Sequence, residues 1–535
     1  MKYTREDLKT LKARGIKKEE IERQLSNFER GFDFADLIEP ATPDNGIRII
    51  QENEKKYLID LYDKASQKAD IVKMVPASGS ASRMFKDLYT FKETYTGSTE
   101  DFLKLVQEKE YDSINGFFLR LEDFPFYSRL QDVIWSDGKD LKKMLEKRMY
   151  TEILDYILTE KGLNYGDMPK ALIDFHIYRD FVRTAFDEHF VEAAMYAKRK
   201  KEAHLHFTVS EQYIPLFKER LNKIAPVFEK MFKVKYHVTF SIQKPSTDTI
   251  SVYKNGEVVR DEKGKIMFRP GGHGALIHNL DEIKADVVFI KNIDNVIPDR
   301  SKADTVTHKK LLAGLLLEMQ SKIFEKLEQL DKRSISDKEL EEIDCFIEKN
   351  LGYKKPESFE SKNKKERIKH FKNILNRPIR VCGMVKNEGE PGGGPFWVKG
   401  SDGGIRLMII ESAQVDVKNK DQKKVFDKAT HFNPVDIVCG TRDHKGKHFN
   451  LSKFIDEDQG FISLKSYKGK EIKVQELPGL WNGAMAKWTT LFVEVPLSTF
   501  TPVKTVYDLR RTEHTNVFSN HEGHVDFIET RSENE

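Results

Sequence analysis

The sequence predicts an α/β fold in which helices cover both faces of a mainly parallel sheet. Short runs rich in β-branched and aromatic residues, each long enough for one strand, occupy residues 71–75, 204–210, 236–243, 249–253 and 286–294. Stretches with apolar residues at helical spacing separate several of these runs, and the clearest covers residues 214–232. Strands that alternate with helices are typical of βαβ units, whose strands run parallel.

The composition narrows the function classes. A chain of 535 residues with 39% hydrophobic and 11% aromatic side chains can form two or three packed units. Its 90 basic and 86 acidic residues nearly cancel, which argues against a nucleic-acid partner. The three cysteines lack a CxxC spacing, and no apolar run is long enough for a signal peptide or a membrane span. We therefore expect a cytoplasmic protein without a membrane partner.

The chain divides into five predicted regions. A charged helical segment comes first, and in it Thr4 and Asp7 form a capping box while Gly15 ends the first helix. An α/β domain with a helical insertion follows, then a Lys- and Glu-rich helical connector exposed to solvent, a β-rich lobe and a polar tail. The boundaries are 1–68, 69–306 with the insertion at about 85–165, 307–376, 377–510 and 511–535.

The first candidate site is the loop that follows the strand at residues 71–75. Its small side chains let a phosphate approach the backbone N–H groups, and they are Ala77, Ser78, Gly79, Ser80, Ala81 and Ser82. Arg83 would then contribute a cation for a triphosphate. The loop lacks the spacing of a Walker A motif, and an ordinary strand-to-helix turn is the alternative.

The second and third candidates are a glycine-rich turn and a strand end. Gly272, His273 and Gly274 can wrap a ligand through backbone contacts, although a hairpin end is the alternative. The apolar run at 287–290 predicts a central strand that ends near Asp294, where a carboxylate could hold Mg²⁺ beside a triphosphate. In the alternative, Asp294 only caps the next turn.

Two further positions are open to two interpretations each. Pro169 suits the first position of a helix, which would place Lys170 where the helix dipole disfavours a cation unless phosphate binds. A solvent-facing lysine is the alternative. His204 and His206 would share one face of a strand as a metal pair, but no third ligand follows at a familiar spacing, so packed histidines are the stronger interpretation.

In this order the motifs resemble those of the nucleotidyltransferases that make nucleotide sugars, in particular the UDP-sugar pyrophosphorylases. Residues 79–84 lie where that family has G-x-G-T-R-[ML], with Ala81 and Ser82 replacing the second glycine and the threonine. Residues 169–170, 270–274 and 292–295 match its Pro-Lys, P-G-G-H/N-G and N-x-D-N motifs. The chain as a whole also resembles an uncharacterised bacterial family, domain of unknown function 4301.

This resemblance implies a Rossmann-like sheet of the GT-A type and a role for each matched residue. Arg83 and Lys170 would be catalytic, Gln243 would contact the base, and Asp294 would bind Mg²⁺. The sugar phosphate would lie against residues of the β-rich lobe, namely Glu411, Asn433 and Asn482.

The implied reaction couples a nucleoside triphosphate to a sugar 1-phosphate with release of pyrophosphate. A non-catalytic nucleotide or nucleotide-sugar binding protein is one alternative. A GT-A glycosyltransferase is another, but its usual D-x-D motif lacks the first aspartate in Asn292-Ile293-Asp294. The sequence leaves the base, the sugar and the oligomeric state open.

Overall fold

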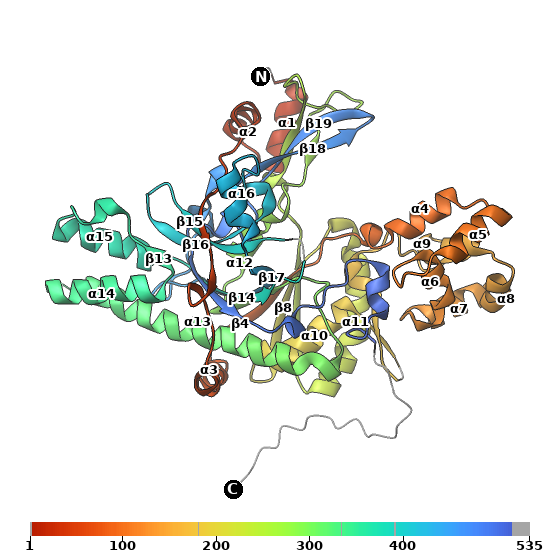
Figure 1. Cartoon of the computed structure of the whole chain (residues 1–535), viewed down its shortest axis with the longest axis horizontal. Helices are drawn as coiled ribbons and strands as arrows, with labels where there is room; N and C mark the ends of the chain where they lie inside the picture. Colours follow the sequence, from red (N-terminus) through yellow and green to blue (C-terminus); the bar gives the residue numbers. More distant parts are fainter. Residues whose placement is uncertain (1–2, 180, 333, 390–391, 516–535) are drawn as a thin grey trace, which may run out of the picture.

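The computed structural model describes residues 3–179, 181–332, 334–389 and 392–515 (Figure 1), so residues 516–535 of the predicted polar tail lie outside it. The chain has a mixed α/β fold built around one large sheet. Four strands in one half of this sheet run parallel to their neighbours in the order β9–β8–β4–β12. They are β9 (Lys235–Ser241), β8 (Glu202–Thr208), β4 (Ile71–Pro76) and β12 (Val287–Lys291), and each overlaps a run that the sequence predicts as a strand.

The other half of the large sheet contains strands of both directions. β17 (His431–Gly440) pairs antiparallel with β12 on one side and with β14 (Ile379–Lys386) on the other. The next strand in the sheet is β20 (Thr489–Glu494), which pairs parallel with β14. Beyond β20, β3 (Gly46–Arg48) pairs parallel with β20, and β2 (Thr42–Pro43) pairs parallel with β3. At the other end of the sheet, β7 (Lys198–Arg199) pairs antiparallel with β8. The sheet is therefore mixed.

The smaller sheets are antiparallel throughout. One contains β1 (Asp36–Pro40), β15 (Gly394–Lys399), β16 (Ile405–Ile410) and β13 (Tyr353–Lys354). A second contains β11 (Phe268–Arg269), β10 (Thr249–Tyr253), β19 (Lys470–Glu476) and β18 (Phe461–Tyr467). The third pairs β5 (Asp174–Ile177) with β6 (Val182–Thr184).

The strands cross the region boundaries that the sequence predicts. Residues 1–68 contain β1, β2 and β3 besides their helices, and β14, β17 and β20 from residues 377–510 complete the large sheet. The β-rich part is therefore not a separate lobe. Strand pairing depends on backbone hydrogen bonds between distant segments, which hydrophobic patterns along the chain do not encode.

The two faces of the large sheet are covered differently. Long helices pack on one face, and they are α3 (Glu52–Ala65), α10 (Ala185–Tyr196), α11 (Ile214–Phe232) and α13 (Lys302–Leu330). The short helix α12 (Ile277–Glu282) and the strands β15 and β16 contribute the apolar residues on the other face. The site described below lies at the edge between these two layers.

Helix α13 corrects the expectation of a solvated connector at 307–376. Leu311, Leu312, Leu315 and Leu316 are buried, because the apolar run in this helix faces the sheet and α3. Gly314 permits the close approach, since a Cβ atom there would lie 2.1 Å from the carbonyl oxygen of Leu58 in α3. Only the later helices, α14 (Asp337–Asn350) and α15 (Lys364–Leu375), carry mostly exposed charges.

The remaining helices form separate groups. α1 (Arg5–Arg14) has the predicted capping box between Thr4 and Asp7 and ends at Gly15, whose φ is 72°, and α2 (Lys18–Arg30) follows it. One group of short helices lies at the right end of the molecule in Figure 1. Its members are α4 (Lys86–Thr94), α5 (Thr99–Gln107), α6 (Ile114–Leu119), α7 (Tyr127–Ser136), α8 (Leu141–Glu146) and α9 (Tyr150–Leu158), and α16 (Lys420–Asp427) lies apart from them beside β1. No helix in the described part of the chain has the length and apolarity to cross a bilayer.

A buried charge cluster joins the two central parallel strands. The carboxylate of Glu192 in α10 accepts hydrogen bonds from Lys73 Nζ of β4 at 2.6 Å and from Lys291 Nζ of β12 at 2.7 Å. All three side chains are almost fully buried. Burial lowers the pKa of Lys73 to about 7, and burial would raise the pKa of Glu192 if Lys291 and Lys73 did not hold it well below its usual range.

Glu192→Gln should destabilise the fold. The substitution keeps the side-chain shape but leaves two buried ammonium groups without a counter-charge, which typically costs about 3–5 kcal/mol. Urea denaturation should therefore give a lower midpoint, and adding Lys73→Met should recover part of the loss. Glu219→Gln, which breaks an exposed pair with Lys223, is the matched control and should leave the midpoint unchanged. Equal midpoints for wild type and Glu192→Gln would contradict this account of the cluster.

Candidate functional site

The small-residue loop after β4 lies against the Pro169–Lys170 segment. The N–H of Ala81 donates to the carbonyl of Met168 at 3.1 Å, and the N–H of Lys170 donates to the carbonyl of Gly79 at 3.0 Å. An antiparallel bridge pairs Ser80 with Pro169 between these two bonds. The structure therefore brings together two motifs that lie about 90 residues apart in the sequence.

Three consecutive backbone donors of this loop are free. The N–H groups of Ser78, Gly79 and Ser80 make no hydrogen bond to the described residues, and these three residues are exposed. Successive free N–H groups at a turn favour an anion. The predicted contributions of Ala77 and Ala81 need correction, because both residues are buried and their N–H groups already donate to Thr208 and Met168.

Lys170 does not begin an α-helix, contrary to the sequence prediction. A single 3₁₀ turn, Lys170–Leu172, leads directly into β5 because residue 170 is hydrogen-bonded to the loop and the following apolar residues pair with β6. The argument from the helix dipole therefore fails. The Lys170 side chain instead forms an ion pair with a carboxylate.

That carboxylate is Asp294, in the turn after β12. Lys170 Nζ lies 2.6 Å from Asp294 Oδ2, and the two side chains are 14% and 24% exposed. Neither side chain is fully buried, so a ligand can reach the pair. Asp294 thus contacts the predicted cation through its side chain, and the alternative of a simple turn cap loses its support.

A C-terminal segment that sequence reasoning missed holds the Asp294 turn in place. The N–H of Val503 donates to the carbonyl of Asp294 at 3.1 Å, and that of Thr501 donates to Asn295 Oδ1 at 3.0 Å. The N–H of Val506 donates to the carbonyl of Met84 at 3.0 Å, next to Arg83. In the sequence, the one weak signal for this role is Pro502, whose backbone forms a bridge with Asn295.

Arg83 lies in the short 3₁₀ turn Ala81–Arg83 and is exposed. Its guanidinium group makes no ion pair or hydrogen bond with the described part of the chain. Arg83 follows the three free N–H groups by three to five residues, and an unpaired guanidinium favours an anion.

The Gln243 side of the site packs against the glycine-rich turn. Gln243 Nε2 donates to Thr247 Oγ1 at 3.4 Å, and a Cβ atom at Gly271 would lie 2.5 Å from the carbonyl oxygen of Thr247. Gly272 has a φ of 82°, and a Cβ atom at Gly274 would lie 2.0 Å from the carbonyl oxygen of Pro478. The turn is therefore wedged between two backbone segments, which explains its glycines.

His273 is held as a neutral ring on an aromatic partner. Its ring stacks on Trp481, with centroids 4.4 Å apart and planes 18° from parallel. Its Nδ1 accepts a hydrogen bond from the N–H of Leu480 at 3.0 Å, so the proton of the neutral ring is on Nε2. Burial lowers the pKa of His273, although Glu411 and Glu476 oppose the shift.

The three predicted sugar-phosphate residues also meet at this place. Trp481 Nε1 donates to Glu411 Oε1 at 3.2 Å, and the neighbouring Asn482 is buried with an Oδ1 atom that has no hydrogen-bond partner among the described residues. The N–H of Asn433 donates to the carbonyl of Gly393, where a Cβ atom would lie 3.1 Å from Glu411 Cγ. Asn482 Oδ1 is therefore a buried acceptor without a donor among the described residues.

The backbone beside Asn433 is unusual. Val435, a β-branched residue within β17, has a φ of 59°, and its N–H donates to Asn433 Oδ1 at 3.0 Å. Such conformations persist only where the surroundings enforce them, and they gather at functional sites. The hydrogen bond from Val435 fixes where Asn433 Oδ1 lies.

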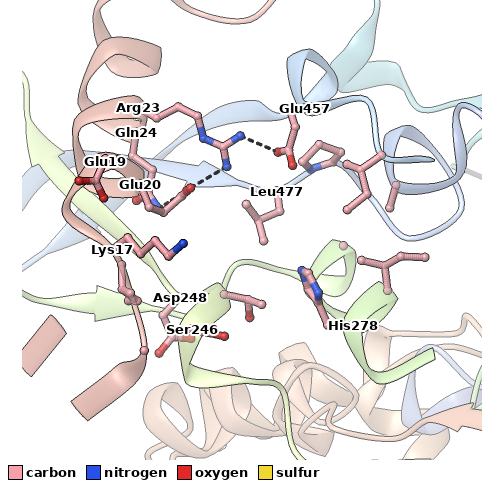
Figure 2. A pocket seen from close by; sticks show the side chains of 18 residues that line it. Lys17, Glu19, Glu20, Arg23, Gln24, Ser246, Asp248, His278, Glu457 and Leu477 are labelled. Atoms are coloured by element: carbon pink, nitrogen blue, oxygen red, sulfur yellow. Dashed lines mark hydrogen bonds and ion pairs between the residues drawn. The ribbon is translucent and has the colours of Figure 1, made fainter. Parts of the chain in front are cut away.

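A cavity of about 430 Å³ lies behind the glycine-rich turn, which is a volume typical of small-molecule sites. Its walls come from residues 15–17 between α1 and α2, from α2, from the start of α12 and from the segments around residues 246, 457 and 478. Gly274 is the one predicted site residue in its lining. Figure 2 shows Arg23 bridging Glu20 and Glu457 across its upper wall, at 2.8 and 3.1 Å. The cavity does not include the Lys170–Asp294 pair.

Comparisons with known proteins identify a matching family and distantly similar solved structures. The family model described as domain of unknown function (DUF4301) matches residues 4–515. No curated protein matches significantly. Solved structures similar to this chain include the UDP-N-acetylglucosamine pyrophosphorylase of Trypanosoma brucei, at 12% identity and a TM-score of 0.45, with 95% of this chain and 79% of that chain covered. The UDP-glucose pyrophosphorylase of Leishmania major is similar at 12% identity and a TM-score of 0.41, with 94% and 77% covered.

Gly274→Ala should displace the glycine-rich turn, because its Cβ atom would collide with the backbone of Pro478. We expect a lower melting temperature and altered tryptophan fluorescence, since His273 stacks on Trp481. Gly79→Ala is the matched control, because no atom of the residues in the structure's described ranges lies within 4 Å of its added Cβ. It should leave both measurements unchanged. A Gly274→Ala variant with wild-type melting and fluorescence would refute the assigned packing.

Proposed function

The chain belongs to the family described as domain of unknown function 4301, and we propose that it transfers the nucleotidyl group of a nucleoside triphosphate to a sugar 1-phosphate. The observation that carries this proposal is the Lys170–Asp294 ion pair beside the free N–H groups of residues 78–80. A phosphate-binding turn, a cation and a single carboxylate at one place are the parts that phosphoryl and nucleotidyl transfer require.

The position of this cluster in the sheet supports the proposal. The strand order β9–β8–β4–β12 corresponds to 3-2-1-4 in chain order, as in one half of a Rossmann sheet, so the order reverses between β4 and β12. Ligands of open α/β sheets bind outside the carboxyl ends of the strands at such a switch point. Residues 77–83 follow β4 and Asp294 follows β12. We therefore propose a nucleotide-binding half-sheet of the GT-A type.

The remaining predicted residues fit the two substrates. Gln243 follows β9 at the same edge, where the base would lie between it and the turn around Gly272. Glu411, Asn433 and the unpartnered Oδ1 of Asn482 offer acceptors for sugar hydroxyl groups. Because β17 runs antiparallel to β12, its first residues lie at the edge where β12 ends.

The donor set is compatible with Mg²⁺. Proteins usually hold this ion through one or two carboxylates together with substrate phosphates and water, and Asp294 supplies one carboxylate. Bound there, Mg²⁺ would neutralise charge on the triphosphate. In this structure the cation next to Asp294 is the ammonium group of Lys170. If Mg²⁺ bound at Asp294 together with the substrate, this ammonium group would turn toward a phosphate.

The proposed reaction needs no general base. An oxygen of the sugar 1-phosphate attacks the α-phosphorus of the nucleoside triphosphate, and the bond from that phosphorus to the leaving pyrophosphate breaks. The attacking group is already ionised at neutral pH, because the second pKa of a phosphate monoester is about 6. The protein then has to align the two substrates and offset their charge, which Arg83, Lys170 and the free N–H groups do.

Pyrophosphate release with Mg²⁺ and a panel of nucleoside triphosphates and sugar 1-phosphates tests the proposal. We expect turnover for at least one pair, no turnover for Asp294→Asn, and a loss of about 100-fold in kcat/KM for Arg83→Ala, equivalent to about 3 kcal/mol. Lys86→Ala, which removes a nearby exposed lysine outside the loop, should retain the wild-type rate.

Two outcomes would contradict this reaction. Nucleotide binding without turnover across the panel would favour the alternative of a non-catalytic binding protein. Turnover of a finished nucleotide sugar in place of a triphosphate would favour the glycosyltransferase alternative.

A further inference from the structure

A cluster of possible metal ligands lies at the start of strands β8 and β9, on one face of the large sheet. The two strands are parallel and in register, with His204 opposite His237 and Glu202 opposite Lys235. Side chains two residues apart on a strand share a face, so Glu202 and His204 lie on the face that also carries His237. The sequence suggested His204 with His206 instead, because the cross-strand partner is 33 residues away.

The three side chains lie close together but form no hydrogen bond with one another. The rings of His204 and His237 stack with centroids 4.5 Å apart, and His237 Nε2 lies 3.9 Å from Glu202 Oε1. One ligand atom from each of the three residues lies within 4.8 Å of the other two. These separations exceed hydrogen-bond length but approach the spacing of ligands around one ion.

An orphaned nitrogen provides a second observation. His237 Nε2 is shielded from solvent and has no hydrogen-bond partner among the residues that the structure describes. Leaving a buried polar atom unpaired costs free energy, so such atoms in native proteins call for a partner. In the tautomer that leaves Nε2 unprotonated, the missing partner accepts a lone pair next to the carboxylate of Glu202, which lies 3.9 Å away. A cation meets both conditions.

We propose that Glu202, His204 and His237 bind one Zn²⁺ ion, with water as the fourth ligand. Two imidazoles and one carboxylate form a recognised zinc ligand set, and zinc favours four ligands in a tetrahedral arrangement. With metal–ligand bonds of about 2.0 Å, ligand atoms lie about 3.3 Å apart, so small rotations of these partly exposed side chains close the site.

The site would act as a cross-strand link, separate from the proposed nucleotide site. The nucleotide residues follow the carboxyl ends of the strands, whereas Glu202 begins β8. A bound ion would connect β8 to the outer strand β9 and stabilise this end of the sheet, because it binds only the folded arrangement.

His206 offers a matched control. It lies on the same face of β8, but its Nδ1 and Nε2 are each 2.8 Å from a hydroxyl oxygen, of Thr239 and Ser241 respectively. Both ring nitrogens are therefore already occupied, and His206 should not contribute to metal binding.

The test uses the full chain after treatment with a chelator. Calorimetric titration with Zn²⁺ should give one ion per chain and a higher melting temperature, and Co²⁺ should produce the visible absorption bands of a four-coordinate site. His237→Ala and Glu202→Gln should each weaken binding by about tenfold or more, while His206→Ala should bind as wild type does.

Two results would overturn the proposal. One is the absence of Zn²⁺ binding to the wild-type chain. The other is unchanged stoichiometry and affinity in the double variant His204→Gln with His237→Ala, which would assign the ion to another place. Because the Co²⁺ spectrum is measured on the wild-type chain, the proposal stays testable even if a variant folds poorly.

Discussion

The geometry of the candidate site depends on one buried carboxylate between two buried lysines. Glu192 accepts hydrogen bonds from Lys73 in β4 and Lys291 in β12, the two parallel strands that flank the switch point. His189, one turn earlier on α10, places its Nε2 3.1 Å from the carbonyl of Ile293, next to Asp294. Helix α10 thereby fixes both strands and the turn after β12. The same buried contacts therefore stabilise the core and position the site.

The site itself is assembled from segments far apart in the chain. The Lys170 segment contacts both the loop after β4 and the Asp294 turn. Residues 499–506 hydrogen-bond to the Asp294 turn and to Met84 at the end of that loop. Few of these contacts are apolar. The result places three free N–H groups and the exposed Arg83 near the Lys170–Asp294 pair, an arrangement that favours an anion.

Local signals in the sequence predicted a large part of this arrangement. The four strands β4, β8, β9 and β12, helix α11 and the capping box at Thr4 follow from hydrophobic period and cap chemistry. The order of the motifs also placed Lys170 and Asp294 in one site, although the helix expected at Lys170 is a 3₁₀ turn. A backbone hydrogen bond to Gly79 decides that turn, and no local pattern reveals such a bond.

Long-range features could not be predicted in the same way. Lys73 and Lys291 interrupt apolar strands, which signals a buried charge, but their common partner is about 100 residues from each. Lysines and glutamates around the apolar stripe of α13 obscure it in the sequence. The pairing of β17 joins two predicted regions, because its neighbours are β12 from residues 69–306 and β14 from residues 377–510.

A crystal structure with a nucleoside triphosphate and Mn²⁺ tests the central claim most directly. Mn²⁺ shares the oxygen-ligand preference of Mg²⁺ and can be located by its anomalous scattering. The account predicts phosphates on the N–H groups of residues 78–80, the metal at Asp294, and Lys170 Nζ moved from that carboxylate to a phosphate. A nucleotide bound in the cavity beside α1 and α2, with the Lys170–Asp294 pair intact, would contradict it.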